Sequence, residues 1–157
     1  MKSLFLILIF FSTNAIAAVD LVKVDKSDRK MYLLDGSKVV RTYDIALGAN
    51  PYGHKIQEGD ERTPEGVYIL DYLKLDSAFY KAMHVSYPNK KDILHSKSLG
   101  KPTGGDIKIH GIRNGSDYIS KFQRWKDWTA GCIAVTNEEV DELYESVKIG
   151  AKIEIFK

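Results

Sequence analysis

Cysteine is almost absent from this chain of 157 residues, in which Cys132 is the single example. One cysteine cannot form an internal disulfide, so the disulfide-rich class of small secreted scaffolds is excluded. Cys132 is therefore an inert buried thiol, one half of an intermolecular bridge or a reactive group. The residues near Cys132 in the sequence distinguish among these three interpretations.

Long hydrophobic runs are also missing. The apolar run LFLILIFF covers residues 4–11, whereas a membrane-spanning helix needs about 20 residues. Lys2 precedes this run and the small-residue stretch NAIA follows it, which is the pattern of a secretory signal peptide. We therefore expect residues 1–17 to be a cleaved signal peptide and residues 18–157 to form one domain. Such a protein reaches the periplasm or cell wall without a stable membrane anchor.

The chain also lacks an excess of charge of either sign, because its formal net charge is only +2. It contains no basic stripe with interleaved aromatic residues. Binding to a polyanion needs such a stripe, so nucleic acid is excluded as a partner. The four histidines and the one cysteine do not show the spacing of metal ligands. We expect no metal and no cofactor, and nothing in the sequence indicates the oligomeric state.

Short runs in which apolar and polar residues alternate dominate the rest of the chain. Period two is typical of strands, so a mainly β domain is predicted. Asp35-Gly36 separates two of these runs and indicates a tight hairpin. The expected strands cover residues 21–25, 31–36, 38–47, 66–73, 107–112 and 152–157.

Helical patterns are few. The better one begins after Thr136, with Glu139 completing a capping box, and it carries an apolar stripe that includes Val147 before Gly150 ends it. A weaker pattern begins near Ser116 and includes Tyr118, Phe122 and Trp125. Two stretches, residues 49–66 and 112–131, fit no regular structure and are candidates for binding loops or for plain surface.

Alternation places two reactive side chains on the same side of the sheet. Ile107 and Ile109 share the core face of their strand, so His110 points away from the core. The same argument places Cys132 and Ala134 off the core, because Ile133 is apolar. An imidazole beside a thiol favours the thiolate, the form that attacks carbonyl carbons, so a Cys–His pair predicts acyl transfer.

The other histidines carry weaker signals. His54 lies in the polar loop PYGHKIQEGDERTPEG, where it either lines a substrate cleft or is merely exposed. His84 follows Met83 in an expected strand and is interpreted as structural. His95 lies in a lysine-rich stretch and is interpreted as solvated surface.

A combination of motifs resembles a known family. TAGCI lies 22 residues after IHG and is followed by TNEEVDELY and GAKIEI, while HKIQEGDERTPEGVYIL, VSYPN and GGDIKIHG occur upstream. This combination resembles the catalytic domain of bacterial L,D-transpeptidases, the YkuD family. The resemblance extends roughly from Asp20 to Phe156.

The resemblance implies a mainly β, sandwich-like or barrel-like fold with a few short helices, one of them after the cysteine strand. It also implies that Cys132 attacks peptidoglycan stem peptides, with His110 as base and the Gly111 carbonyl orienting the imidazole. Thr129 and Gly131 match the family signature, and the Gly131 and Cys132 amides are the implied oxyanion donors. Carbapenem-type β-lactams are implied as covalent inhibitors.

Two alanines depart from the family pattern. Ala130 stands where His, Arg or Lys is common, and Ala134 stands where Arg or Asn is common and is expected to face the cleft. Donor recognition therefore needs other groups, and Arg113, Arg124, Trp128 and His54 are the candidates for substrate binding. The longer His-to-Cys interval predicts an aromatic and basic insertion over the site. We expect Phe122 and Trp125 to pack this insertion onto the sheet, and direct stacking on sugar is the alternative.

The acceptor of the acyl group defines the activity. A stem amine gives an L,D-transpeptidase, a lysine amine gives an anchored protein, and water gives an L,D-carboxypeptidase or an amide hydrolase. A non-catalytic peptidoglycan-binding module is the alternative of a different class, although the Cys–His pair argues against it. A redox thiol protein needs a second cysteine, which the chain lacks.

Overall fold

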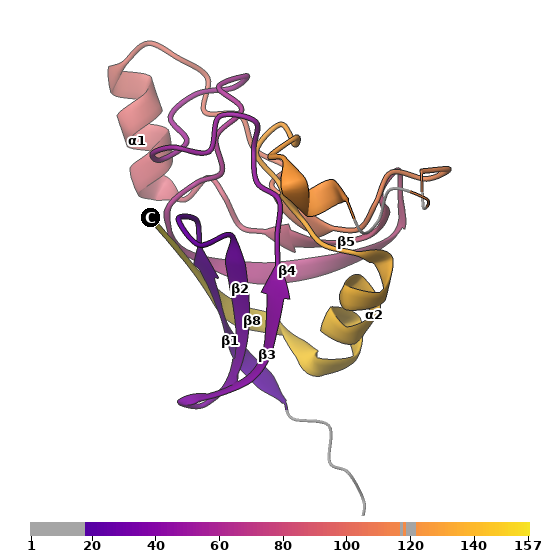
Figure 1. The fold of residues 1–157 in the computed structure, drawn as a ribbon. Helices are drawn as coiled ribbons and strands as arrows, with labels where there is room; N and C mark the ends of the chain where they lie inside the picture. The colour runs from indigo at the N-terminus through magenta and orange to yellow at the C-terminus, as the bar shows by residue number, and fades with distance from the viewer. Residues whose placement is uncertain (1–17, 117, 119–121) are drawn as a thin grey trace, which may run out of the picture.

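The computed structural model describes residues 18–116, 118 and 122–157. One curled sheet of eight strands dominates it, in the order β3-β2-β1-β8-β4-β5-β6-β7 (Figure 1). The expectation of a mainly β fold is confirmed. The strands are β1 (Val19–Asp25), β2 (Lys30–Asp35), β3 (Lys38–Asp44), β4 (Gly66–Ser77), β5 (Tyr80–Val85), β6 (Lys108–His110), β7 (Ile133–Ala134) and β8 (Val147–Phe156).

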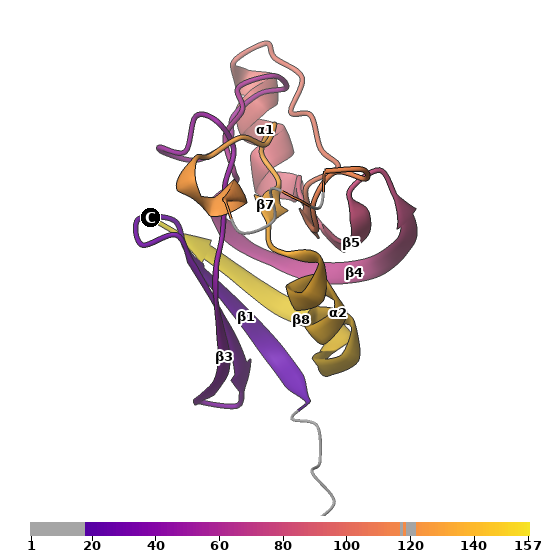
Figure 2. The same ribbon diagram turned by 45° about the vertical axis from the view of Figure 1, so that its right-hand side comes forward.

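The sheet curls until its two edges nearly meet. β3 forms one edge and β7 the other, and the chain that leaves β3 bridges to the β7 region through Ala46 with Ala134 and Gly48 with Thr129. These bridges make the fold barrel-like and create a seam between residues 45–49 and 129–134. Figure 2 shows β7 above β4, between α1 and α2.

The core fills the inside of the curl. Alternate residues of the central strands point into it, such as Val22 and Val24 of β1 and Ile153 and Ile155 of β8, all at most 3% exposed. Each fully buried aliphatic side chain of this kind contributes ~1.5–3 kcal/mol to folding. Period-two alternation in the sequence arises from this one-sided burial.

The hairpin between β2 and β3 confirms the prediction made from Asp35-Gly36. Asp35 pairs with Lys38, and Gly36 has φ +59°, a conformation that glycine adopts without steric cost.

Helix α2 (Asn137–Ser146) begins with the expected capping box, in which Thr136 and Glu139 satisfy each other's backbone N–H groups. The expected end at Gly150 is wrong, because Val147 is already the first residue of β8. Val19 pairs with Val147 but Leu21 pairs with Lys152, so β8 bulges between these pairs. Gly150, with φ +92°, lies in that bulge and not at a helix end.

Helix α1 (Lys90–Ser98) was not predicted, and His95 lies exposed on it. Asn89 and Asp92 form its capping box, and its buried residues are Asp92 and Ser96, so it has no apolar stripe for a periodicity argument to detect. In the part of the weaker helical pattern that the structure describes, the chain forms 3-10 structure at Tyr118 and in η2 (Gln123–Trp125), with no α-helix.

Residues 1–17, which we expect to be a signal peptide, lie outside the described residues, as do residues 117 and 119–121 of the insertion. Among the helices of the described part of the chain, none is long and apolar enough to cross a membrane.

Candidate active site

The candidate site lies on the seam. β6 and β7 run parallel, with Ile109 beside Ile133 and His110 beside Ala134, so the register places Cys132 beside Lys108. A cavity of about 590 Å³ opens at this point. Its lining consists of Phe79, His110, Ile112, Arg113, Ser116, Trp128, Thr129, Ala130 and Cys132.

The His110 ring is oriented by its neighbour in the chain. Its Nδ1 lies 2.7 Å from the Gly111 carbonyl oxygen, which can only accept, so Nδ1 carries the proton and Nε2 is left with a lone pair. His110 lines the cavity but is only 4% exposed, because Phe79 and Trp128 cover it with ring centroids at 4.6 and 5.7 Å. Alternation therefore predicted its face correctly, but not that aromatic rings would bury it.

The close packing around Gly111 leaves no room for a side chain. A Cβ atom there would lie 2.4 Å from Asn137 Oδ1, an atom that already accepts the Ile112 N–H at 2.9 Å. Asn137 thus packs the start of α2 against the turn that presents His110. Sequence reasoning missed this residue, because nothing in its local pattern distinguishes it from any other first residue of a helix.

Cys132 is a free thiol that is partly exposed to the cavity. Its Sγ lies 3.8 Å from the carbonyl oxygen of Asp106. Burial raises the pKa of the Cys132 thiol, and a hydrogen bond from the Lys108 backbone, the charge of Lys108 and that of Lys55 partly oppose this.

The imidazole is shifted in the opposite direction. Burial, helped by the charge of Lys108, lowers the pKa of His110, although its hydrogen bond to Gly111 works against this. A thiol with a raised pKa and an imidazole with a lowered pKa are both neutral at rest. A neutral imidazole and a neutral thiol in one cavity suit general-base activation, in which the base takes the proton as the sulfur attacks, and not a preformed thiolate.

Thr129 and Gly131 shape the turn before Cys132. The buried Thr129 donates from Oγ1 to the Cys132 carbonyl at 2.8 Å and accepts the Gly131 N–H at 3.1 Å. The Gly131 N–H is therefore engaged and does not point free into the cavity as an implied oxyanion donor would. Gly131, with φ +129°, is required, because a Cβ there would lie 2.7 Å from the Arg62 carbonyl oxygen.

The substrate-binding candidates are separated by the fold. Arg113 and Trp128 line the cavity. Arg124 lies outside that lining, where its Nη1 pairs with Asp44 Oδ2 at 3.0 Å.

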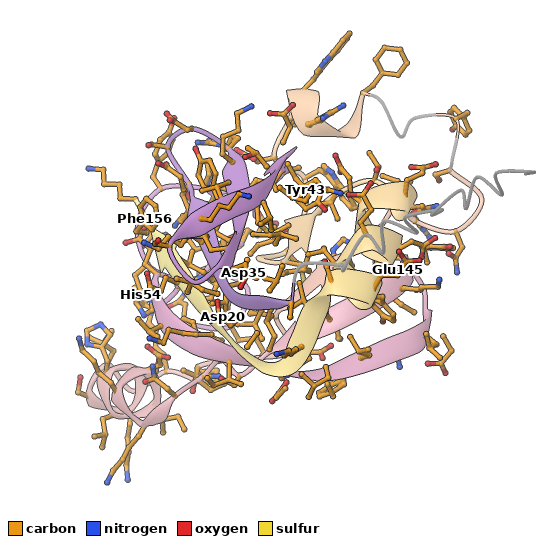
Figure 3. All side chains as sticks on the ribbon, turned by 90° about the horizontal axis from the view of Figure 1, so that it is seen from below. Asp20, Asp35, Tyr43, His54, Glu145 and Phe156 are labelled. Atoms are coloured by element: carbon orange, nitrogen blue, oxygen red, sulfur yellow. The ribbon has the colours of Figure 1, made fainter. Side chains whose placement is uncertain are left out.

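His54 also lies elsewhere, on the side of the molecule where α1 lies (Figure 3). Its Nε2 is 3.2 Å from Asp92 of α1, and its Nδ1 accepts the Glu65 N–H at 2.9 Å. His54 thereby ties the loop 49–66 to α1.

Ala134 does not face the cleft, so that expectation is wrong. It shares a sheet face with His110, but it is fully buried because the segment around Ala46 crosses it, with hydrogen bonds of 2.8 and 3.0 Å between the two alanines. Closure of the barrel is the cause, since a strand end that looks free in the sequence is covered by the opposite edge. Ala130, by contrast, is exposed and lines the cavity.

Asp127 is a further residue that sequence reasoning missed. Its carboxylate accepts the Leu47 N–H at 2.9 Å and two N–H groups of Arg29, at 3.1 and 2.8 Å. The next residue, Trp128, donates its own N–H to the Leu47 carbonyl at 3.1 Å. Asp127 therefore anchors the end of the insertion and holds the Trp128 ring beside His110.

A metal centre has no support from side-chain clustering. Within residues 18–116, 118 and 122–157, no three His, Cys, Asp or Glu side chains gather closely enough to hold an ion.

Comparison with known proteins identifies the family of this chain. The family model for the L,D-transpeptidase catalytic domain (YkuD) matches residues 20–155. The chain belongs to this family. The Escherichia coli (strain K12) protein YafK is 30% identical over 132 residues, which are 80% of this chain and 46% of YafK.

Solved structures show the same fold. A crystal structure of a variant of the helical cell shape determining protein Pgp2 from Campylobacter jejuni matches with a TM-score of 0.65 and 28% identity, over 88% of this chain and 47% of Pgp2. The L,D-transpeptidase LdtMt1 in complex with imipenem matches with a TM-score of 0.55 and 16% identity, over 87% of this chain and 58% of LdtMt1. This chain thus spans about half the length of the YafK and Pgp2 chains.

Proposed function

We propose that this YkuD-family protein is an exported cysteine acyltransferase that acts on peptidoglycan stem peptides. The observation that carries the proposal is the His110 ring, whose Nδ1 is committed to Gly111 while the ring shares one cavity with the thiol of Cys132. This arrangement leaves Nε2 as the base. The Gly111 carbonyl fixes the tautomer of the ring, so no carboxylate is needed as the third member of a catalytic triad.

The chemistry proceeds in two steps. Cys132 Sγ attacks the carbonyl carbon of the third stem residue while its proton passes to His110 Nε2. The C–N bond to the terminal D-alanine then breaks, the leaving amine takes that proton, and a thioester remains on Cys132. An acceptor amine next attacks the thioester carbonyl carbon and loses a proton to His110. The C–S bond breaks as the new amide forms, and the leaving sulfur takes that proton, which restores the thiol.

The lining of the cavity fits such a substrate. Phe79, Ile112 and Trp128 supply apolar surface, while Arg113 is a cation at the rim that suits a stem carboxylate. Water in place of the amine gives the L,D-carboxypeptidase or amide hydrolase. That difference lies in the acceptor, not in Cys132 or His110.

A carbapenem tests the proposal directly, because a nucleophilic thiol should open its β-lactam ring. After incubation with imipenem, the intact mass of the wild-type protein should increase by one inhibitor. Cys132→Ala should gain nothing, and His110→Gln should acylate about 10²–10⁴-fold more slowly. His95→Ala, which removes an exposed histidine on α1, is the matched control and should acylate at the wild-type rate.

The outcomes separate the alternatives. Incubation with defined tetrapeptide muropeptides should yield cross-linked dimers from a transpeptidase and tripeptides alone from a carboxypeptidase. A protein that binds muropeptides without any adduct or product would be a non-catalytic binding module. An imipenem adduct that persists in Cys132→Ala would exclude Cys132 as the nucleophile.

Export is part of the same proposal, and it rests on the leader pattern of residues 1–17. The protein purified from the periplasm of a bacterial host should have the mass of a chain that begins at Ala18. A periplasmic or cytoplasmic product that keeps residues 1–17 would contradict it.

A further inference from the structure

A second hollow lies beside the candidate active site. It has a volume of about 350 Å³ and is lined by Arg29, Asp44, Ile45, Arg124 and Trp125. None of these residues lines the catalytic cavity. We call this hollow the Trp125 groove.

The aromatic residues of the insertion do not pack onto the sheet as the sequence suggested. Trp125 is 80% exposed and Phe122 is 54% exposed, and their rings contact each other edge to face with centroids at 4.8 Å. An exposed indole beside a hollow marks an interaction surface, because burying it in the protein would have been favourable.

The polar side of the groove has a defined character. Asp44 Oδ2 accepts from Arg124 Nη1 at 3.0 Å, and the carboxylate of Asp44 also pairs with Lys30. Arg29 is held by Asp127 at 2.8 Å. The groove thus presents planar acceptors and donors with fixed orientations next to a flat aromatic face. Sugars suit this combination, since their C–H faces stack on aromatic rings while their hydroxyl groups bind carboxylate and guanidinium groups.

The position of the groove fits the geometry of a stem peptide. Trp125 belongs to the groove and Trp128 to the catalytic cavity, so at most ~11 Å of chain separates their Cα atoms. The three stem residues between the attacked carbonyl and the sugar cover a comparable length, roughly 10 Å, when extended. A stem seated at Cys132 is therefore long enough to extend toward the Trp125 groove.

We propose that the Trp125 groove is a saccharide subsite that takes an N-acetylated amino sugar of the glycan strand carrying the donor stem. This proposal rests on the proposed function. The competing occupant is a lipid surface, since exposed aromatic and basic residues also dock on anionic membranes. The carboxylate of Asp44 in the groove disfavours that occupant, because it would face anionic headgroups.

The experiment uses the two tryptophans as separate reporters. Uniformly ¹⁵N-labelled Cys132→Ala protein contains two indole N–H groups, from Trp125 and Trp128. Titration with chitotetraose, a chain of four N-acetylglucosamine units, should shift the Trp125 signal in a saturable way. Trp125→Ala, followed by calorimetry, should weaken the binding about tenfold, and Phe122→Ala should weaken it less.

Tyr72→Ala is the matched control, because Tyr72 is a 43% exposed aromatic residue of β4 and lies outside the groove. It should bind chitotetraose like its parent. An absent or non-saturable shift, or equal affinities for Trp125→Ala and Tyr72→Ala, would overturn the saccharide subsite. Binding to phosphatidylglycerol vesicles that depends on Trp125, without sugar binding, would assign the groove to a membrane instead.

Imipenem acylation of the protein with its thiol intact separates this proposal from the proposed function. Acylation without sugar binding refutes the groove alone. Sugar binding without acylation refutes the acyltransferase and leaves a glycan-binding module.

Discussion

The two long loops of this protein, residues 49–66 and 112–131, look alike in the sequence but are held in opposite ways. The first is ordered by charged groups buried beneath it. The second is anchored at both ends and exposes aromatic residues between them. Polar composition therefore does not distinguish a scaffold loop from a binding loop; the location of the buried hydrogen bonds does.

The loop 49–66 encloses two buried lysines. Lys26, 3% exposed, donates from Nζ to the carbonyls of Gly53 and Thr63 and to Glu65, at 2.7, 3.0 and 2.8 Å. Lys55, also 3% exposed, reaches Asp60 at 2.7 Å, and that carboxylate accepts the Ile56 N–H. Each buried ammonium has its acceptors, so the loop is a fixed wall of the fold.

The loop 112–131 is anchored at both ends, and at its start Asn114 forms hydrogen bonds with residues 77, 78 and 80 of the β4–β5 hairpin. Asp127 joins it to Arg29 and Leu47, and Thr129 joins it to the seam. Trp125, only two residues before Asp127, is 80% exposed. The anchored ends of this loop thus flank the catalytic cavity, whereas the exposed Trp125 lines the Trp125 groove.

The largest expected effect comes from removing the buried charge under the first loop. Lys26→Met keeps the length of the side chain but leaves Glu65 and two carbonyls without their donor. The free energy of unfolding should fall by ~2–4 kcal/mol. Denaturant unfolding measures this, with the exposed Lys148→Met as control, for which a change within ~0.5 kcal/mol is expected. Equal stabilities of the two variants would show that the first loop is not held by Lys26.

The anchor of the second loop should affect catalysis more than the fold. Asp127→Ala removes the bidentate pair with Arg29 and the acceptor for Leu47, so Trp128 loses its position beside His110. We expect imipenem acylation to slow about 10–100-fold and the free energy of unfolding to fall by only ~1–3 kcal/mol. Asp76→Ala, whose carboxylate is 91% exposed, should change neither quantity. An unchanged acylation rate in Asp127→Ala would show that Trp128 needs no anchor.

The charges of Lys108 and Asp106, both near Cys132, should move the pKa of its thiol in opposite directions. Lys108 is paired with Asp106 and lowers this pKa, Lys55 also lowers it, and Asp106 raises it. Lys108→Met should therefore raise the pKa and slow alkylation by iodoacetamide at neutral pH. Asp106→Asn should lower the pKa and speed alkylation. The pH dependence of the alkylation rate measures both shifts, and shifts of the same sign would contradict this electrostatic account.

The smallest expected effect is that of Trp125→Ala on stability. An indole that is 80% exposed contributes little packing, so the free energy of unfolding should change by at most ~0.5 kcal/mol. Trp128→Ala should lose at least ~1 kcal/mol, because Trp128 packs on Phe79 and His110. Thermal unfolding of both variants measures this contrast. A large loss in Trp125→Ala would make the middle of the second loop structural.

Local patterns in the sequence predicted the features that depend on neighbouring residues. The β2–β3 hairpin follows from Asp35-Gly36, and the start of α2 follows from Thr136 and Glu139. Helix α1 escaped prediction because its capping residues are polar and its buried side chains are Asp92 and Ser96. The end of α2 was predicted too late. Gly150 belongs to a bulge in β8, and this bulge forms only because β8 pairs with the distant strand β1.

By itself, the sequence determined the mainly β class, the strand faces and the motif set that marks the YkuD family, because alternation and capping act over a few residues. Only the tertiary structure decided that the barrel closes over Ala134, that Arg124 and His54 lie outside the cavity, and that Asp127 meets Arg29. These features join residues far apart in the chain. A polar side chain has many possible partners, and the curl of the sheet decides which of them lies within reach. No pattern of neighbouring residues in the sequence predicts that curl.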